Sequence, residues 1–375
     1  MKKIIYWSPH INPQIATVKA VLNSAKCLSN YDKNFEVNII NVFGEWDKFK
    51  YICSKDNINL INLTNFNFNL PINGVLKSRL FYIFISIISI FKLPLIINKL
   101  KPDYFIAHLI VTPVLFISTF YSSTKFILRI SGLPKLNFLR KNIWKTLSKN
   151  LYLVTCPTMG TLEQLIKLKI FERNKILLLE DPVLNVREIM KKRSENIPFE
   201  SGYILSVGRL THQKNFEFLI ENFSKIQNEI KKKLIIIGSG ELKKKLEKLI
   251  IINNAEKFIR IIDYQDNIHK FYKNADCFIL TSRWEDPGFV LIEAAVNNLA
   301  ILSCDSPNGP KDFIKDEANG YSYANDNKNE FSLKLAKLLK NLETKEVYRK
   351  KVSAKLFIKK YTIFSHYLKL KQILK

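Results

Sequence analysis

The chain has 375 residues, of which 47% are hydrophobic and 25% are charged. This length suits about two domains, and the composition excludes an intrinsically disordered protein. The five cysteines lie far apart and form neither a Cys-x-x-Cys pair nor a cluster with histidine. That spacing excludes a disulfide framework and a structural zinc site, and it suits a reducing cytosol. The first residues, MKKIIYWSPHINPQ, contain only a short apolar run, so no secretory signal is expected.

The net charge of +26 is distributed unevenly. Residues 1–150 carry 20 Lys and Arg against 6 Asp and Glu, whereas residues 151–350 carry 32 against 27. Residues 351–375 carry 7 bases and no acid. Such basic regions are typical of proteins that bind nucleic acid, anionic lipid or a phosphorylated substrate. Biased composition is the alternative for the charge as a whole, but it does not explain the asymmetry.

Short apolar runs rich in β-branched residues recur along the chain and end in turn or cap residues, which is typical of buried parallel strands. The first half is expected to form strands at Lys3–Trp7, Val37–Val42, Tyr104–His108, Lys125–Ile130 and Leu151–Thr155. The second half is expected to form them at Tyr203–Val207, Leu234–Ile237, Ile259–Ile262, Cys277–Leu280 and Ala300–Ser303. Amphipathic helices are predicted between the strands, among them Ala16–Leu28, Phe216–Glu229 and Glu241–Ile251.

Because strands and helices alternate twice over, we expect two doubly wound α/β domains, at residues 1–180 and 201–355. Residues 181–200 are polar, contain two prolines and are predicted to be a linker.

The most apolar segment is Leu80–Ile97, which is interrupted by Lys92 and Pro94. Its uninterrupted part, Leu80–Phe91, has 12 residues, fewer than the roughly 20 that a membrane span needs. The segment is interpreted as a buried helix that precedes the strand at Tyr104. A helix lying at a membrane interface is the alternative.

Four segments of the second half carry candidate chemistry, and each follows a predicted strand. The first, Val207–Asn215, reads VGRLTHQKN. Its glycine allows a ligand to approach the backbone, and Arg209 and Lys214 are two cations that can straddle a diphosphate.

The second segment, IGSGEL at 237–242, is a strand–glycine–helix turn. It lacks the third glycine of a dinucleotide-binding fingerprint, because position 243 is lysine, and no acidic residue follows on a second strand. The segment is therefore weak as a separate indication of a cofactor.

The third segment, SRWEDPGFVLIEAA at 282–295, is the most specific. A turn at Pro287 leads into an apolar helix whose N-terminus would present the N–H groups of Gly288, Phe289 and Val290 to a phosphate. Glu285 precedes this helix, and Glu293 lies on its second turn within an apolar run. A carboxylate at position 293 would be costly to bury without a partner, and ligand hydroxyls would remove that cost. An internal salt bridge is the alternative for both acids.

The fourth segment, DSPNGPKDFI at 305–314, is another strand–turn–helix edge with small polar residues and exposed N–H groups. All four segments are expected at the carboxyl ends of strands in one sheet, where open α/β sheets bind ligands.

These motifs, GRLTHQKN, Glu285-x7-Glu293 and SPNGPKDFI, resemble the nucleotide-binding half of the family-4 retaining glycosyltransferases. In the first half, KPDYFIAHL resembles the strand that ends in a histidine near the active centre of that family, and LRISGLPKLNFLRKNIWK is similar to bacterial surface-polysaccharide members. The resemblance implies the GT-B architecture of two facing Rossmann-like domains.

The resemblance also implies roles for individual residues. Arg209 and Lys214 would hold the diphosphate of a nucleotide-sugar, together with the backbone at Gly288–Val290. Glu293 would bind the ribose hydroxyls, while Glu285 would face the donor sugar. His108 would reach the sugar from the other domain, although a histidine within the core is its alternative. Further donor contacts are expected from the fourth segment, at Asn308, Gly309 and Asp312, although many relatives carry glutamate at the last of these positions.

Glycosyl transfer expels a diphosphate, so the main electrostatic task is to neutralise the charge that grows on it. The chain contains no Asp-x-Asp, and its histidines are scattered. We therefore expect cations and a helix N-terminus to act in place of a metal, and we expect no cofactor. A carboxylate pair also occurs in glycoside hydrolases, but a phosphate-binding framework has no use in that reaction.

The resemblance implies that the first domain receives the acceptor and that the final helix, residues 356–375, returns to it. The segment SAKLFIKKYTIFSHYLKLKQILK is predicted to be one amphipathic basic helix whose charge joins that of residues 1–150. The hypothesis is a cytoplasmic protein, peripheral on the anionic inner face of the membrane.

The predicted reaction moves a hexose or N-acetylhexosamine from a UDP-linked donor to a lipid-linked, lipopolysaccharide or capsule glycan; retention rests on the resemblance alone. Two alternatives stay open, a nucleotide-sugar epimerase of GT-B type and a basic nucleic-acid-binding protein. No nucleic-acid-binding motif is visible, so no nucleic acid is expected as a partner.

Overall fold

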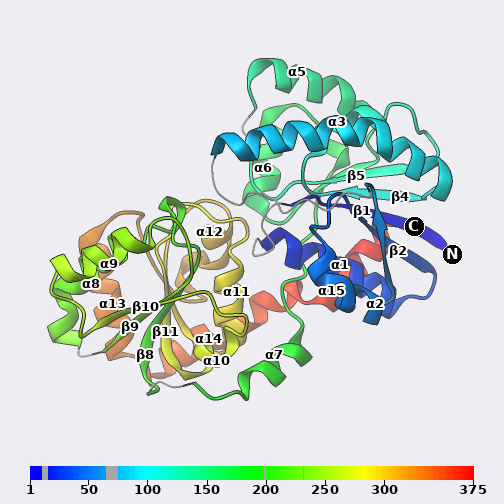
Figure 1. Cartoon of the computed structure of the whole chain (residues 1–375). Helices are drawn as coiled ribbons and strands as arrows, with labels where there is room; N and C mark the ends of the chain where they lie inside the picture. The colour runs from blue at the N-terminus through cyan, green and yellow to red at the C-terminus, as the bar shows by residue number, and fades with distance from the viewer. Residues whose placement is uncertain (11–15, 65–74, 135, 198–199, 231) are drawn as a thin grey trace. The chain divides into compact units, whose positions relative to one another are not determined.

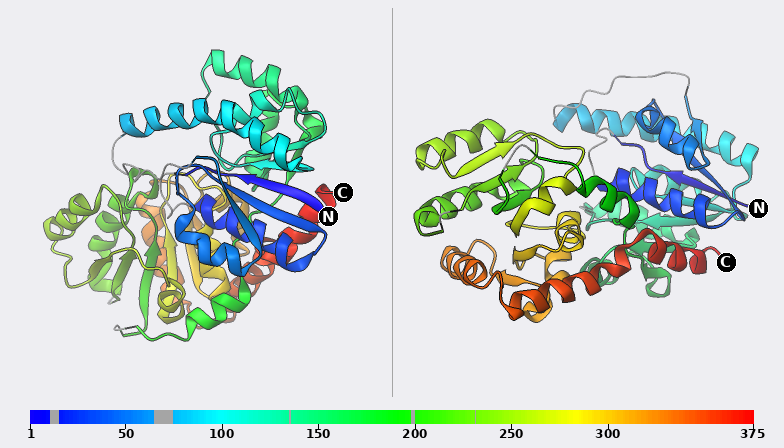
Figure 2. Two further views of the ribbon diagram at one scale, coloured as in Figure 1. Left: turned by 45° about the vertical axis from the view of Figure 1, so that its right-hand side comes forward. Right: turned by 90° about the horizontal axis from the view of Figure 1, so that it is seen from below.

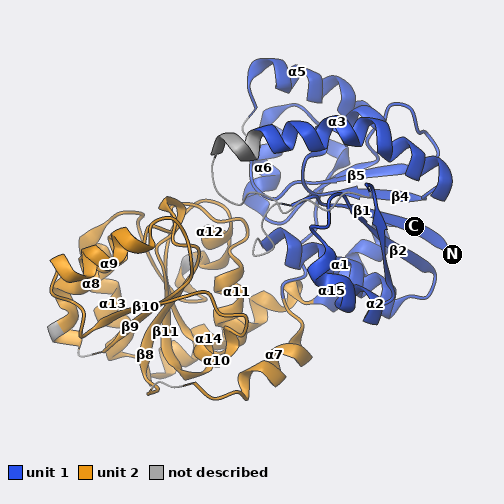
Figure 3. Cartoon of the chain, in the orientation of Figure 1, with its two compact units in different colours: residues 1–183, 363–375 blue, residues 184–362 orange. Residues whose placement is uncertain are grey.

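The computed structural model describes residues 1–10, 16–64, 75–134, 136–197, 200–230 and 232–375 (Figure 1). The chain forms two compact units, coloured separately in Figure 3. Unit 1 consists of Met1–Val183 and Ile363–Lys375, and unit 2 consists of Leu184–Thr362. Each is an α/β domain built on one parallel sheet, as the alternation of strands and helices predicts.

Unit 1 contains a seven-stranded parallel sheet in the order β3-β2-β1-β4-β5-β6-β7. Ile4 of β1 lies opposite Val37 on one side and Tyr104 on the other, so the strand order reverses around β1. In open α/β sheets such a reversal leaves a crevice at the carboxyl ends of the strands. The strands are β1 Lys2–Trp7, β2 Phe35–Asn41, β3 Ile58–Asn62, β4 Tyr104–Ala107, β5 Lys125–Arg129, β6 Leu153–Cys156 and β7 Ile176–Leu178.

Helices cover both faces of this sheet, and each face has its own apolar core. One core joins the sheet to α1 Ala16–Tyr31, α2 Lys50–Lys55 and α15 Ile363–Ile373. The other joins it to α3 Val75–Leu100, α4 Val111–Ile117, α5 Phe138–Leu147 and α6 Met159–Leu168. All five cysteines are buried free thiols.

Helix α3 differs from the buried helix expected from its composition. It runs through Pro94 without ending, and only 22% of its most apolar window is buried. The side chains that face the sheet recur every four residues, at Ile85, Ser89, Leu93 and Ile97, whereas the opposite side of the helix is exposed. A uniformly apolar run shows no periodicity, so the sequence could not reveal that only one stripe packs.

Unit 2 contains a six-stranded parallel sheet in the order β10-β9-β8-β11-β12-β13. Here the order reverses between β8 and β11, the strands that precede the first and third motif segments. The strands are β8 Tyr203–Val207, β9 Leu234–Ile237, β10 Ile259–Ile262, β11 Ala275–Leu280, β12 Ala300–Cys304 and β13 Tyr321–Tyr323. The helices are α7 Val186–Arg193, α8 Phe216–Ile230, α9 Lys243–Ile252, α10 His269–Asn274, α11 Phe289–Val296, α12 Gly309–Phe313, α13 Lys328–Lys340 and α14 Lys345–Ile358.

Residues 181–200, predicted as a linker, contain the helix α7. Its N-cap is Asn185, whose side chain accepts a hydrogen bond from the backbone N–H of Glu188. The helix is attached to unit 2, since the Asn267 side chain donates to the carbonyl of Lys192.

The C-terminal segment forms two helices rather than the single helix expected. Helix α14 ends at Ile358, a 3₁₀ turn spans Lys359–Tyr361, and α15 begins at Ile363. Thr362 between them is extended, which interrupts the helical backbone. Helix α15 packs against α1 within unit 1, and the two ends of the chain lie close together in Figures 1 and 2. Lys2 Nζ donates to the carbonyl of Leu374 at 2.9 Å.

Candidate active site

The carboxyl edge of the unit 2 sheet brings the four motif segments together. A Cβ at Gly238 would lie 1.8 Å from the carbonyl oxygen of Gly208, so the loops after β8 and β9 touch through their backbones. A Cβ at Gly309 would lie 1.8 Å from the carbonyl oxygen of Pro287, so the loops after β11 and β12 touch in the same way. These close approaches leave no room for a side chain and explain the glycines at both positions.

Lys214 and Glu285 join the two pairs of loops. Lys214 ends the 3₁₀ turn η4 (His212–Lys214) and forms an ion pair with Glu285. Both side chains are at most about one-tenth exposed: 10% for Lys214 and 8% for Glu285. Removing two charges from water is costly, and a buried ion pair does little more than offset that cost. The pair is the internal salt bridge named above as the alternative for Glu285, and it contributes little net stability.

Arg209 has a different environment from Lys214. Its guanidinium is exposed and donates to the side-chain oxygen of Gln213 at 3.0 Å. The amide of the same glutamine donates to the carbonyl of Trp284 at 2.9 Å. Gln213, which the sequence did not single out, thus connects the first segment with the third. One of the two predicted cations is therefore exposed, and the other is buried in an ion pair.

Helix α11 follows Gly288, which is the N-cap and has a φ of +84°. This left-handed conformation favours glycine. The first backbone N–H groups of a helix have no acceptor within it, so Phe289 and Val290 begin the helix as donors. Glu293 is buried on the second turn, within the apolar run, and its charge adds to burial in raising the pKa of Tyr272. The Tyr272 hydroxyl donates to the carbonyl of Val290 at 3.2 Å.

Backbone N–H groups of the fourth segment, expected to be exposed, form hydrogen bonds within the protein. The N–H of Gly309 donates to the carbonyl of Glu285 at 3.2 Å and is not an exposed donor. Asn308 has a φ of +67° and precedes α12, a helix of five residues. Asp312 is half-buried on that helix, and its N–H donates to the carbonyl of Asn308. The segment therefore acts first as a brace for the Glu285 loop.

We expect Gly309→Ala to destabilise unit 2 by about 1–3 kcal/mol, because the new methyl group must displace the backbone at Pro287. Lys311→Ala is the control, since Lys311 lies two residues away and is exposed. Thermal unfolding of both variants checks this expectation. A melting temperature for Gly309→Ala equal to that of the control would show that the two loops separate freely.

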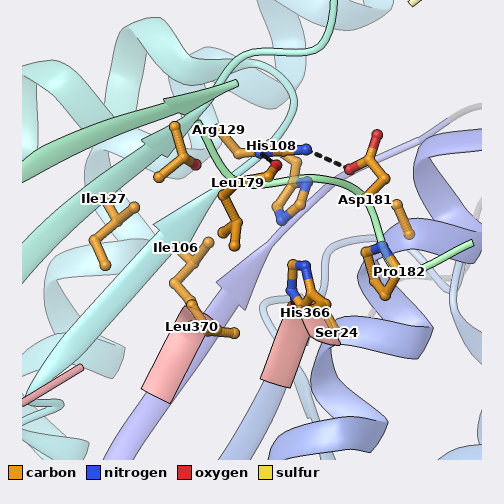
Figure 4. A pocket seen from close by; sticks show the side chains of 12 residues that line it. Ser24, Ile106, His108, Ile127, Arg129, Leu179, Asp181, Pro182, His366 and Leu370 are labelled. Atoms are coloured by element: carbon orange, nitrogen blue, oxygen red, sulfur yellow. Dashed lines mark hydrogen bonds and ion pairs between the residues drawn. The ribbon is translucent and has the colours of Figure 1, made fainter. Parts of the chain in front are cut away.

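His108 belongs to unit 1, whereas the other ten predicted site residues belong to unit 2. It follows β4 and lines a cavity of about 20 Å³, which has room for about one water molecule (Figure 4). Arg129, Asp181, His366 and Ser24 line the same cavity. His108 lies between Arg129 and His366 in Figure 4. Burial, the Arg129 charge and His366 all lower the pKa of His108, so its imidazole is neutral near pH 7.

Two buried interactions of this cavity were missed by sequence reasoning. Arg129 forms an ion pair with Asp181 at 2.5 Å and donates to the carbonyl of Leu179 at 2.5 Å. His366 donates from Nδ1 to the carbonyl of Glu180, so its Nε2 accepts from the Ser24 hydroxyl. The sequence did offer one indication of Arg129, because it is a charged residue within the apolar strand Lys125–Ile130. Glu293 was noticed for the same reason, as a charged residue within the apolar run of α11.

Three histidines of unit 1 make its stability depend on pH. Burial lowers the pKa of His10 to about 4 and that of His366 to about 3, and it lowers that of His108 as well. In the unfolded chain each titrates near 6.5, so between that pH and the lower native values the unfolded state binds more protons. The free energy of unfolding therefore falls as the pH is lowered.

We expect a loss of about 2 kcal/mol each for His10 and His366 between pH 7 and pH 5. Urea unfolding over this range measures it, and His10→Gln is expected to reduce the slope. A free energy of unfolding that stays constant from pH 7 to pH 5 would contradict the neutral native state of these histidines.

Comparisons with known proteins agree with this architecture. Residues 188–355 match the family model of the group 1 glycosyl transferases. An uncharacterized glycosyltransferase of Methanocaldococcus jannaschii is 28% identical over 334 residues, which cover 82% of this chain and 78% of that protein. The N-acetylgalactosamine-N,N'-diacetylbacillosaminyl-diphospho-undecaprenol 4-alpha-N-acetylgalactosaminyltransferase of Campylobacter jejuni is 26% identical over 63% of this chain and 66% of its own.

Among solved structures, Anabaena HepE in complex with UDP is similar with a TM-score of 0.73. The match covers 100% of this chain and 99% of that one at 12% identity, so it bears on the fold alone. Both units have the Rossmann-like parallel sheet of GT-B enzymes, and the matched domain contains all ten predicted site residues of unit 2. The chain is therefore a glycosyltransferase of GT-B fold whose second unit is a group 1 glycosyltransferase domain.

Proposed function

We propose that unit 2 binds a nucleotide-diphosphate sugar, with UDP as the nucleotide, at the carboxyl edge of its sheet. The observation that carries this proposal is the buried Lys214–Glu285 pair, which lies where the four loops meet beside the exposed Arg209. A buried cation next to an exposed one suits a diphosphate that must be bound and then released. Anabaena HepE, whose fold is similar, has been crystallised with UDP.

Each residue then has a defined task. Lys214 and Arg209 neutralise the charge that grows on the leaving diphosphate, and the first N–H groups of α11 at Phe289 and Val290 add to this stabilisation. Glu285 orients the donor sugar, while Glu293 accepts hydrogen bonds from the ribose hydroxyls. The Glu293 carboxylate is buried on α11, so a ligand hydroxyl adds hydrogen bonds in a place where water is scarce.

In unit 1 we propose that His108 contributes to the donor-sugar site as a neutral imidazole, and that this unit receives the acceptor. The acceptor is a lipid-linked or polysaccharide glycan, and transfer proceeds with retention at the anomeric carbon. The Campylobacter relative is named for a transfer to a diphospho-undecaprenol-linked saccharide. The basic charge of residues 1–150 suits an acceptor of this class, which carries its own diphosphate and lies in an anionic membrane.

A transfer assay tests the proposal. The purified protein is incubated with a panel of UDP- and GDP-sugars and with an undecaprenyl-diphosphate-linked saccharide, and the product is analysed by mass spectrometry and by NMR of the new anomeric centre. We expect a mass gain of one hexose or N-acetylhexosamine in an α-linkage. Lys257→Ala is the matched control for substitutions in the proposed site such as Lys214→Ala, because Lys257 is an exposed lysine at the opposite edge of the sheet, before β10. Binding of the same nucleotide-sugars is measured separately. If the protein bound none of them, the proposed donor would be refuted.

A further inference from the structure

Unit 1 exposes a second apolar surface on α3, on the side that faces away from the sheet. The exposed residues Ile83, Ile87, Phe91 and Leu95 recur every four positions, and Phe91 is 71% exposed. They are offset by two residues from the packed stripe at Ile85, Ser89, Leu93 and Ile97. Two residues are about 200° of helical rotation, so the two stripes lie on opposite sides of one helix.

The neighbouring helices also expose apolar side chains. Helix α4 contacts both α3 and α5, and all three share one apolar core with the sheet, on the side where α3 and α5 lie in Figure 1. Phe116 is exposed on the last turn of α4 and Phe120 in the turn that follows it, and Phe138, Leu139 and Ile143 are exposed on α5. We call these residues and the outer stripe of α3 the α3–α5 face. An exposed apolar surface contributed by several elements marks an interaction site rather than ordinary surface exposure.

The charge of this region indicates the kind of partner. Residues 57–162 contain 12 Lys and Arg and a single acid, Asp103. Lys92 of α3 is exposed, as are Arg140, Lys141 and Lys145 of α5. Large aromatic and aliphatic side chains with basic residues around them match the acyl chains and headgroups of an anionic bilayer.

The packing of α3 in unit 1 indicates whether this helix would lie on a bilayer or cross it. Among the described residues, α3 contains the only segment long and apolar enough to span a membrane, Leu80–Leu100, with a mean hydropathy of 2.4. Crossing would pull Ile85, Leu93 and Ile97 out of the core of unit 1, where they are almost fully buried. A helix that keeps one stripe packed can insert only the other.

We propose that the α3–α5 face inserts its exposed apolar side chains into the interface of an anionic membrane, with α3 lying parallel to the bilayer. This inference does not depend on the proposed donor. It extends the peripheral location that the charge suggests, because it assigns the contact to a defined apolar surface, and it would keep unit 1 where lipid-linked acceptors are concentrated.

Vesicle flotation of the full chain tests this inference. We expect the protein to float with vesicles of phosphatidylcholine mixed with phosphatidylglycerol and much less with phosphatidylcholine alone. The double variant Ile87→Glu/Phe91→Glu changes exposed residues only, and it should lower the floated fraction roughly tenfold or more. Ile251→Glu/Ile252→Glu on α9 is the matched control, since these residues are 59% and 75% exposed in unit 2, and it should float like the wild type.

Three outcomes would overturn the inference: no flotation of the wild type with anionic vesicles, equal flotation of both double variants, or a change of oligomeric state in Ile87→Glu/Phe91→Glu with flotation retained. The last result would assign the face to a contact between copies of the chain. Binding of UDP-sugars by the same preparations is measured separately. A failed flotation with intact donor binding would therefore reject the membrane surface alone.

Discussion

Replacement of Lys214 by alanine is expected to lower kcat/KM for the donor sugar by about 10²- to 10³-fold. The cation would be lost from the position where charge grows on the leaving diphosphate. In addition, the Glu285 carboxylate would remain buried without its ion-pair partner, where it repels the same phosphates. The measurement is steady-state transfer with the donor identified by the panel.

The second of these effects can be separated from the first. In Lys214→Ala/Glu285→Gln the buried negative charge is also removed, so UDP binding should recover in part relative to Lys214→Ala, whereas transfer should stay low. Glu285→Gln alone should bind UDP more tightly than the wild type, because Lys214 is released from its pair. If Lys214→Ala transferred sugar at the rate of Lys257→Ala, the assignment of Lys214 to the diphosphate would be wrong.

Replacement of Arg129 by methionine is expected to destabilise unit 1 by about 3–5 kcal/mol, because it leaves Asp181 as an unpaired charge in the interior. Both side chains are at most 5% exposed, and Arg129 also satisfies the carbonyl of Leu179, so its removal leaves two acceptors without their donor. Denaturant unfolding measures the loss.

The double variant Arg129→Met/Asp181→Leu provides the control for this interaction. It removes both charges, so part of the lost stability should return. Lys125→Met, at the exposed start of the same strand, should change stability by less than either. A single Arg129→Met variant as stable as the wild type would show that the pair contributes nothing to the fold.

The sequence predicted the central strands of both sheets because these strands are continuous apolar runs. It missed β3, β7 and β13, all of which lie at sheet edges. Edge strands are short, and their faces can be less completely covered, so polar side chains interrupt the apolar pattern: β13 reads YSY, and β3, INLIN, carries asparagine and is mostly only partly buried. Three-residue strands also give too short a pattern for periodicity to detect.

The unit 2 edge could be predicted because its residues lie in four short segments that each follow a strand, and parallel strands bring their carboxyl ends together. The cavity of unit 1 could not be predicted from the sequence, because Arg129, Asp181 and His366 come from distant parts of the chain. No local pattern places a residue of the last helix beside residues of β5. The exposed stripe of α3 could not be predicted either. Every side of that helix is apolar, so the sequence pattern does not distinguish the packed side from the exposed one.

Calorimetric titration of the nucleotide-sugar into four forms of the protein measures donor binding at the unit 2 sheet edge. The wild type and Lys257→Ala should bind it equally. Arg209→Ala and Glu293→Ala should each bind at least about tenfold more weakly, since each loses a charged contact. Equal affinity in all four would contradict the claim that the carboxyl edge of the unit 2 sheet binds the donor through its diphosphate and its ribose.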